Sequence, residues 1–243
     1  MERLQKILQL SGVASRRQAA LLIASGKVMV DGIFVYEPGY LVEANQSVTI
    51  DGKQLTQENR VYFALNKPTG YITTMSDPKK RKTILDLIDI KERVVPVGRL
   101  DNNTSGLLLL TNDGALLNRL IHPRYMLEKE YHVKVSGLLR KETSKEIEKG
   151  VDLGDFVTAP AKIEGVRYDD KRKNTYLKII IYEGRYRQIR RMFECFGHPV
   201  LKLKRYRFGP ITLEGIPTGA YRPLKIHEVK LLWHFSTAKD AQK

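Results

Sequence analysis

One carboxylate near the middle of the chain stands between two apolar runs. Asp101 lies in a short connection rich in glycine, asparagine and serine, after residues 94–97 and before residues 107–110. Two buried segments joined by a tight polar turn would hold a loop side chain rigidly. Arg99 shares a face with Asp101 in extended backbone, and a neighbouring guanidinium keeps a carboxylate ionised. Such a carboxylate could act as a nucleophile or a base, although Asp in turns also commonly bonds its own loop backbone.

A second group of charged side chains recurs at helical spacing further along the chain. Apolar residues at i, i+3, i+4 and i+7 predict a helix that ends at Gly197: Ile189, Met192, Phe193 and Phe196. The arginines of the same stretch, preceded by Arg185, are expected on the opposite face: Arg187, Arg190 and Arg191. A fork of guanidiniums suits phosphate and carboxylate groups, whereas the plainer interpretation is a solvated helix face.

These two stretches resemble motifs of a known enzyme family. The run Gly98-Arg99-Leu100-Asp101-x-x-Thr104-Ser105-Gly106 is similar to the catalytic motif of pseudouridine synthases, in the branch typified by the RsuA and RluB ribosomal RNA enzymes. Residues 66–70 and 183–193 are similar to two further motifs of that branch, although Tyr186 stands where Asn is common. The resemblance extends from about residue 2 to about residue 232.

The resemblance implies a role for each matched side chain. Asp101 would be the essential residue and Arg190 would pair with it. Tyr131, in a Lys-x-Tyr motif, would stack on the target base and exchange a proton, whereas from the sequence pattern alone it is a core aromatic. Arg99 would help to fill the gap left by the flipped nucleotide. The remaining matched cations would contact RNA around that nucleotide: Lys67, Arg185, Arg187 and Arg191.

The resemblance also implies the reaction and its target. A specific uridine of ribosomal RNA would be isomerised to pseudouridine after base flipping, and this chemistry needs no metal or other cofactor. Residues 73–78 and 118–123 are closer to the RluB type, so large-subunit (23S) RNA is expected ahead of small-subunit RNA. The substrate would be free RNA or RNA in an assembling particle. The sequence pattern does not distinguish attack by Asp101 on the sugar carbon from removal of a neighbouring sugar proton.

Composition agrees with a nucleic-acid partner. The 243 residues contain 42 Lys and Arg against 27 Asp and Glu, a formal charge of +15, which is typical of proteins that bind polyanions. The apolar runs are too short to span a bilayer. Cys195 is the single cysteine and the five His lack metal-ligand spacing, so we expect no disulfide framework and no metal site. We expect a cytoplasmic monomer that does not bind membranes.

The first 58 residues predict a small basic module. Apolar spacing indicates two helices, the second capped by Ser15 and Gln18, followed by hairpins turning at residues 31–32 and 51–52. The pattern resembles the S4-type RNA-binding domain, with Asp31 where Asn is usual. Residues expected to contact RNA lie off the apolar stripes: Arg3, Lys6, Ser15, Arg16, Arg17 and Lys27.

The sequence as a whole predicts an α+β fold of two domains. An S4-like α/β domain with its linker would occupy residues 1–58. A catalytic domain, built on a mixed, mainly antiparallel sheet flanked by helices, would occupy residues 59–235, and residues 236–243 would be a tail. Strands are expected over residues 61–65, 129–135 and 176–182, and helices over residues 84–88 and 141–149. Asp113 is expected to cap a further helix, and residues 76–82 form a basic loop.

Two other function classes stay open from the sequence alone. A non-catalytic RNA-binding or ribosome-assembly factor needs only the basic surface, and the joint presence of Asp101, Tyr131 and Arg190 argues against it. A hydrolytic RNA enzyme needs either zinc ligands or clustered carboxylates, and the sequence pattern offers neither.

Overall fold

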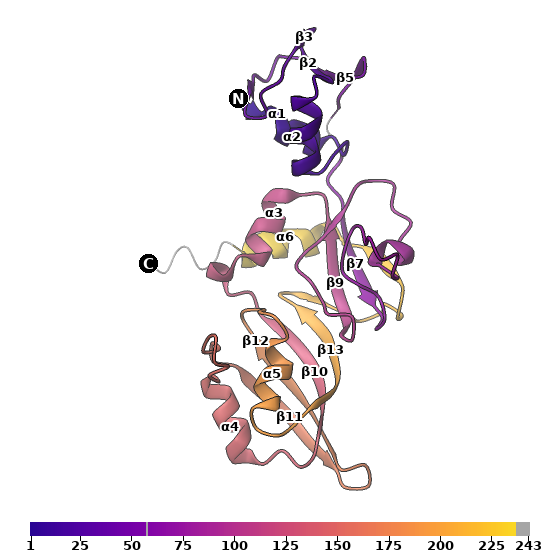
Figure 1. Cartoon of the computed structure of the whole chain (residues 1–243). Coiled ribbons are helices and arrows are strands. Elements are labelled where there is room, and N and C mark those ends of the chain that lie inside the picture. The colour runs from indigo at the N-terminus through magenta and orange to yellow at the C-terminus, as the bar shows by residue number, and fades with distance from the viewer. Residues whose placement is uncertain (57, 237–243) are drawn as a thin grey trace. The chain divides into compact units, whose positions relative to one another are not determined.

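The structure is a computed structural model that describes residues 1–56 and 58–236. By contacts the chain divides into two units. One contains Met1–Val61 and Ile90–Val94, and the other contains Tyr62–Asp89 and the chain from Val95 onward. Figure 1 labels many of their elements. The predicted tail beyond residue 236 lies outside the described residues. Nowhere in the described ranges is a helix long and apolar enough to cross a membrane.

The small unit packs two helices against short strands. Its elements are β1 (Glu2–Arg3), α1 (Leu4–Leu10), α2 (Arg16–Ala24), β2 (Val28–Val30), β3 (Ile33–Phe34), β4 (Leu41–Val42), β5 (Val48–Ile50) and β6 (Lys53–Gln54). The predicted capping box is present, because the Ser15 hydroxyl accepts from the Gln18 backbone and the Gln18 side chain accepts from the Ser15 backbone. Both predicted hairpins form, and Asp31 and Asp51 have left-handed backbone in their turns.

The large unit is organised by one mixed sheet. Its strands are β7 (Tyr62–Lys67), β8 (Val95–Pro96), β9 (Ser105–Thr111), β10 (Lys129–Ser136), β11 (Lys162–Asp169), β12 (Asn174–Ile181), β13 (Val200–Phe208), β14 (Ile211–Thr212) and β15 (Tyr221–Pro223). The main order is β11-β12-β10-β13-β9-β7-β15, while β14 pairs with β13 and β8 pairs with β9. The β13–β9 pair is parallel and the other pairs are antiparallel, as predicted for a mainly antiparallel sheet.

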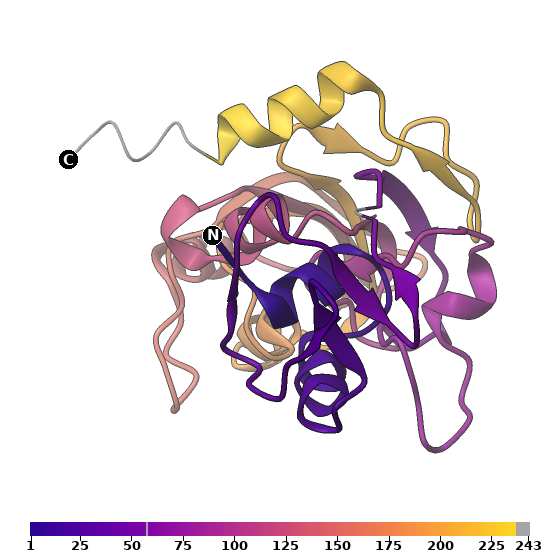
Figure 2. The same cartoon turned by 90° about the horizontal axis from the view of Figure 1, so that it is seen from above.

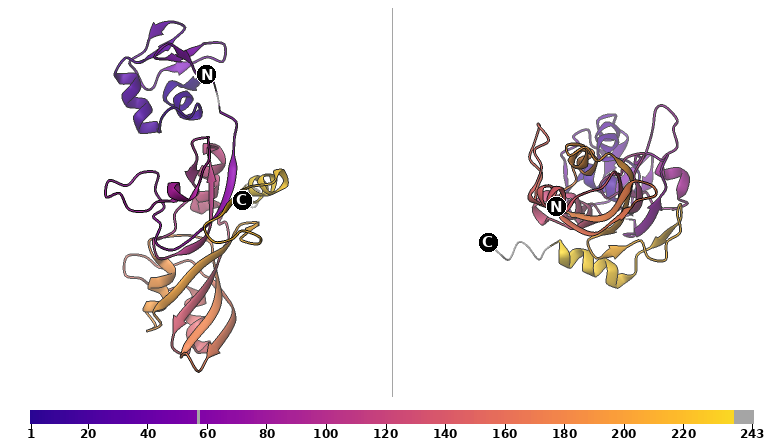
Figure 3. Two further views of the ribbon diagram at one scale, coloured as in Figure 1. Left: turned by 90° about the vertical axis from the view of Figure 1, so that its right-hand side faces the viewer. Right: turned by 90° about the horizontal axis from the view of Figure 1, so that it is seen from below.

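Helices flank this sheet. They are the α-helices α3 (Gly114–Ile121), α4 (Lys141–Lys149), α5 (Gln188–Glu194) and α6 (Ile226–Phe235), and the 3₁₀ turns η1 (Ile84–Leu87) and η2 (Pro123–Tyr125). Asp113 caps α3 by accepting from Ala115 and Leu116, as predicted. In Figure 3 (left), α5 lies on one side of the β10–β13 strands. The segment between β7 and η1 extends as a loop whose base is closed by a bridge between Ile72 and Thr83 (Figure 2).

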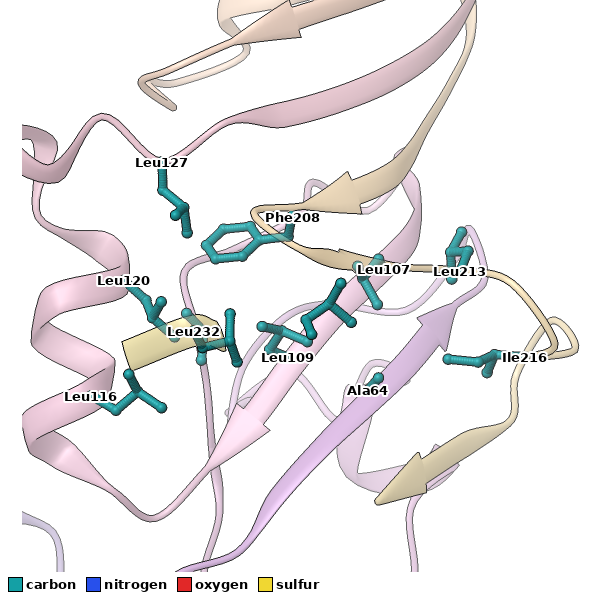
Figure 4. Packing of buried hydrophobic residues seen from close by; sticks show 12 residues of the cluster. Ala64, Leu107, Leu109, Leu116, Leu120, Leu127, Phe208, Leu213, Ile216 and Leu232 are labelled. Atoms are coloured by element: carbon teal, nitrogen blue, oxygen red, sulfur yellow. The ribbon is translucent and has the colours of Figure 1, made fainter. Parts of the chain in front are cut away.

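An apolar core fixes β9 against α3 and α6 (Figure 4). Leu107 and Leu109 of β9 are fully or almost fully buried, and they belong to one cluster with Leu116 and Leu120 of α3 and Leu232 of α6. Burial of a leucine side chain contributes about 1.5–3 kcal/mol. The strand that follows the Asp101 loop is therefore anchored in the core.

Two sequence expectations need correction. The predicted helix begins only at Gln188, so Arg187 lies outside it as a left-handed N-cap residue, and Arg190 is buried rather than on a solvated face. The expected arginine stripe therefore does not form. The helix also ends at Glu194, before Phe196 and Gly197.

Candidate active site

The Asp101 loop is fixed by hydrogen bonds from the segment after β7. The Thr73 hydroxyl donates to the Leu100 carbonyl at 2.8 Å and accepts from the Leu100 amide at 3.2 Å. The Gly70 amide donates to the Asn102 carbonyl at 2.8 Å, and the Thr104 amide to the Asp101 carbonyl at 3.0 Å. Thr73 thus braces the loop just before Asp101, and Gly70 of the Asn66–Gly70 motif braces it just after. This leaves the carboxylate of Asp101 half-buried, with no hydrogen bond to any other described residue.

Lys67 is a buried cation close to Asp101. Its side chain is completely buried at the end of β7, and its Nζ donates to the carbonyls of Pro68 at 3.0 Å and Tyr71 at 2.7 Å. Burial lowers the pKa of Lys67 to about 8, and the negative charge of Asp101 opposes that lowering. The sequence predicted an RNA contact for Lys67, but the structure buries its side chain completely, so it offers RNA no exposed surface.

Asp101 and Tyr131 line the same cleft of about 440 Å³. Tyr131 lies on β10 between Ile179 of β12 and Arg205 of β13, and its side chain is almost entirely buried. A rigid aromatic ring in such a position can stack on a planar base. The cleft is completed by residues from the Asp101 loop, β13 and the segment before α5: Gly98, Arg99, Leu100, Thr104, Gly184, Arg185, Tyr186, Arg187, Gln188, Ile189 and Leu203.

A network of side-chain contacts forms the wall of the cleft just before α5. Glu183 accepts from the Gln188 side chain at 2.8 Å and lies 3.3 Å from the guanidinium of Arg185. The Gln188 side chain in turn accepts from the Arg185 backbone at 3.1 Å. The Arg185 guanidinium also lies over the Phe156 ring, 4.2 Å from its centre. These contacts position Arg185 at the cleft before any ligand arrives.

Arg190 supports the Asp101 loop from behind the cleft. Its guanidinium donates to the Asn103 carbonyl at 2.8 Å and the Val200 carbonyl at 3.0 Å, and its Nε is buried without a hydrogen-bond partner. Burial lowers its pKa, the Arg187 charge adds to that effect, and the Asp101 charge opposes it. The sequence predicted a direct pair between Arg190 and Asp101. The described residues show instead an electrostatic interaction, with the hydrogen bond made two residues further on.

Two other arginines differ from expectation. Arg99 lines the cleft with Asp101, but within the described chain no ion pair joins them. Arg191 does not line the cleft, because its guanidinium is paired with Asp155 at 2.5 Å and donates to the Leu153 carbonyl at 2.8 Å. The ion pair lowers the pKa of Asp155. Arg191 thus anchors the segment that carries Phe156, and its guanidinium lies 5.5 Å from the centre of the ring that Arg185 also contacts.

Sequence reasoning missed several residues of the site. Tyr186 was noted only as a departure from the motif, yet it lines the cleft with its side chain 76% exposed. Lys129 and Arg205 are cations near Tyr131, and burial lowers the pKa of Lys129 to about 8, with Arg205 adding to the lowering and Glu183 opposing it. The Lys-x-Tyr motif could have indicated Lys129. No local signal indicates Phe156, because it reaches Arg185 across the fold.

Gly106 allows the chain leaving the loop to meet β13. Its φ is +110°, and a Cβ there would lie 2.2 Å from the Arg205 carbonyl oxygen. Any other residue would separate the parallel β9–β13 pair, which joins the Asp101 loop to the strand beside Tyr131.

The predicted cations of the small unit are on its surface. Arg3, Arg16, Arg17 and Lys27 are exposed, and Lys6 is exposed while paired with Glu2. The hydroxyl of Ser15, also predicted to bind RNA, has a capping role. In the described ranges, no three His, Cys, Asp or Glu side chains form a group that could hold a metal ion.

Comparison with known proteins agrees with this geometry. Residues 61–195 match the family described as RNA pseudouridylate synthase, and residues 2–48 match the S4 domain. The chain is 46% identical over 233 residues to "Ribosomal large subunit pseudouridine synthase B" of Bacillus subtilis, covering 96% of both. A relative of the same name from Pseudomonas aeruginosa is 39% identical over 241 residues, covering 95% of this chain and 61% of the relative. The solved "Crystal structure of pseudouridylate synthase" has a TM-score of 0.67 and 30% identity, covering 96% of this chain and 100% of that one.

Fold, cleft and relatives together define an RNA-modifying enzyme with an appended RNA-binding domain. The chain belongs to the RNA pseudouridylate synthase family and carries an S4 domain at its N-terminus. The resemblance drawn from the sequence motifs is thereby confirmed.

Proposed function

We propose that this protein isomerises one uridine of large-subunit ribosomal RNA to pseudouridine. The observation that carries the proposal is the shared cleft, which Asp101 and Tyr131 both line. The two relatives compared above are named for the large ribosomal subunit, which favours that substrate over small-subunit RNA.

The reaction breaks one bond and forms another within the same nucleotide. The N1–C1′ bond of uridine is cleaved, the base turns, and C5 bonds to C1′ while the C5 proton is lost and N1 gains a proton. Asp101 either attacks C1′ or removes the neighbouring sugar proton, and both roles need an ionised carboxylate next to the ribose. Lys67 and Arg190 place two buried cationic side chains near it, and their charges interact with that of Asp101.

The other cleft residues have positioning roles in this proposal. Tyr131 stacks on the flipped uracil, and its hydroxyl is suited to exchange a proton with the ring carbon of that uracil. Arg99 occupies the gap left in the RNA, while Arg185 and Arg187 bind phosphates beside the target nucleotide. Flipping costs a few kcal/mol and less in a loop, so a loop or bulge is the expected target.

In this scheme the two units have different roles. Residues 1–58 bind structured RNA through exposed cations, and the domain over residues 59–235 holds the cleft. The protein acts as a cytoplasmic monomer on free RNA or on RNA in an assembling particle.

Tritium release tests the proposed reaction. Ribosomal RNA labelled at uracil C5 is incubated with the purified protein, and loss of the C5 proton releases tritium as isomerisation proceeds. Release from large-subunit RNA, with pseudouridine mapped to one position that is lost in cells lacking the protein, is the expected result. Release only from small-subunit RNA would overturn the substrate assignment, and no release from either RNA would overturn the reaction.

A further inference from the structure

The sheet that carries Tyr131 has a second face that the cleft does not use. Along β10, Tyr131, Val133 and Val135 are buried, and the alternate residues are half-exposed on the other side. The register places Lys178 of β12 and Lys204 of β13 on either side of His132. It likewise places Tyr176 and Lys202 on either side of Lys134.

The edge strand β11 extends both rows across four strands. Glu164 lies opposite Lys178, and Arg167 lies opposite Tyr176. The sheet patch is defined here as six residues of this face: Lys134, Arg167, Tyr176, Lys178, Lys202 and Lys204. Arg167, Lys178 and Lys202 are exposed, and the other three are half-exposed. The face is therefore open to solvent and has a basic centre.

The two carboxylates beside the patch also interact with side chains outside it. Glu164 is paired with Lys162 at 2.6 Å, and Glu130 lies between Arg207 at 3.1 Å and His132 at 3.2 Å. Both nearby carboxylates thus already have cationic partners or a histidine. Lys134 and Lys202 are directly opposite across the β10–β13 ladder, and like charges in that position destabilise a sheet. The repulsion between these two lysines, which lie on inner strands, is offset when a polyanion binds the face.

Aromatic rings lie among the cations. Tyr176 is flanked by Lys134 at 5.5 Å and Arg167 at 5.4 Å from its ring centre. His132 is stacked on Tyr206 with ring centres 4.6 Å apart and an angle of 12°. Cations that bind phosphates, interleaved with rings on which bases stack, are the features by which proteins hold RNA without reading its sequence.

We propose that the sheet patch is a second RNA-binding surface of the large unit, in addition to the cleft. Because alternate residues of a strand point to opposite faces, it lies on the other side of the sheet from Tyr131 and contacts RNA outside the segment that carries the target uridine. The inference rests on the proposed function, since the substrate RNA is its ligand. A long ribosomal RNA engages both faces, whereas a short stem-loop fills only the cleft.

The test compares two triple variants of equal charge. One is Lys134→Gln/Lys178→Gln/Lys202→Gln, and the control replaces three exposed lysines outside the patch, Lys141→Gln/Lys145→Gln/Lys230→Gln. Affinity is measured over a salt series for full-length ribosomal RNA and for a short stem-loop that contains the target uridine. The patch variant is expected to bind the long RNA about 10-fold more weakly, with a salt slope about 2 units smaller than that of the control.

Turnover of the short stem-loop is expected to be the same for both variants and the wild type. The thermal midpoint of the patch variant should not fall, because removing Lys134 and Lys202 relieves a like-charge pair. Equal slopes and affinities for both variants on long RNA would overturn the proposal, as would equal weakening on the stem-loop. If the patch variant shows the expected weaker binding of long RNA but the wild type releases no tritium, the proposed function is overturned and the second RNA-binding surface is supported.

Discussion

The cleft and the helices of the small unit both present arginines, but they hold them differently. Arg185 at the cleft is fixed by Glu183 and by the Phe156 ring, and Arg190 is buried on two backbone carbonyls. Arg16 and Arg17 on α2 are exposed, and in the described part of the chain no carboxylate pairs with them. A held guanidinium has a set direction, whereas a free one contributes charge at low ordering cost. We infer that the cleft positions RNA and that α2 supplies affinity.

Replacement of Arg190, a held arginine, should have the largest effect on the reaction rate. In Arg190→Leu, the carbonyls of Asn103 and Val200 lose their donor, and the Asp101 loop loses its brace. Displacement of a reacting group by about 1 Å can cost about 10²-fold in rate, so we expect kcat to fall by about that factor with RNA affinity changed less than about threefold. Single-turnover kinetics and a binding assay measure the two quantities separately.

Arg222→Leu is the matched control for Arg190→Leu, because it removes a guanidinium that is paired with Glu228, outside the cleft. It should leave kcat within about threefold of the wild type. If both variants lose the same activity, or if Arg190→Leu loses binding rather than rate, the positioning role is wrong.

Replacement of the free arginines should have a smaller and different effect. In Arg16→Gln/Arg17→Gln, each lost phosphate contact lowers the salt slope by about 0.7–0.9, so the slope should fall by about 1.5 and affinity by several fold. The value of kcat at saturating RNA should not change. A titration of RNA binding over a salt series checks this, and a fall in kcat without a change of slope would remove the distinction between held and free cations.

The last prediction concerns the buried lysines and affects stability rather than activity. Lysine ordinarily has a pKa of 10.5, and burial lowers that of Lys129 and of Lys67 to about 8. Between these values the unfolded state binds more protons than the folded state, so both residues make the free energy of unfolding rise with pH. In Lys129→Met this contribution is lost, and each unit of pKa shift corresponds to about 1.4 kcal/mol.

Urea unfolding of wild type and Lys129→Met at several pH values measures the difference. The stability of the wild type relative to the variant should increase from pH 8 toward pH 10.5. A relative stability that stays constant, or that decreases over this range, would show that the pKa of Lys129 is not lowered in the folded protein.

Local patterns predicted the parts of the fold and site that depend on neighbouring residues. The Ser15 capping box, the Asp31 hairpin and the Asp113 cap follow from spacing within a few positions. The site around Asp101 was indicated by the resemblance of its motif to pseudouridine synthases, because spacing alone leaves open an Asp that bonds its own loop backbone. The orientation of Arg190 could not be predicted, because it depends on where α5 begins and on carbonyls 87 and 10 positions away along the chain.

Contacts from distant segments or through the next turn also explain the remaining differences between the predicted and the observed site. Arg191 was expected to face RNA, yet Asp155 and Leu153 hold it from 36 and 38 positions away. Lys67 is the last residue of β7, and its burial depends on how the next turn brings two carbonyls to its Nζ. Helical or strand periodicity contains no information on either contact.

The account depends most directly on the carboxylate of Asp101, and Asp101→Asn tests it with little change in size. Tritium release from C5-labelled large-subunit ribosomal RNA is measured under single-turnover conditions, and the affinity of the same preparation for that RNA is measured alongside. The account predicts that release becomes undetectable while affinity stays within about threefold of the wild type, because Arg185, Arg187 and the S4 domain remain in place. Release at the wild-type rate from Asp101→Asn would contradict it.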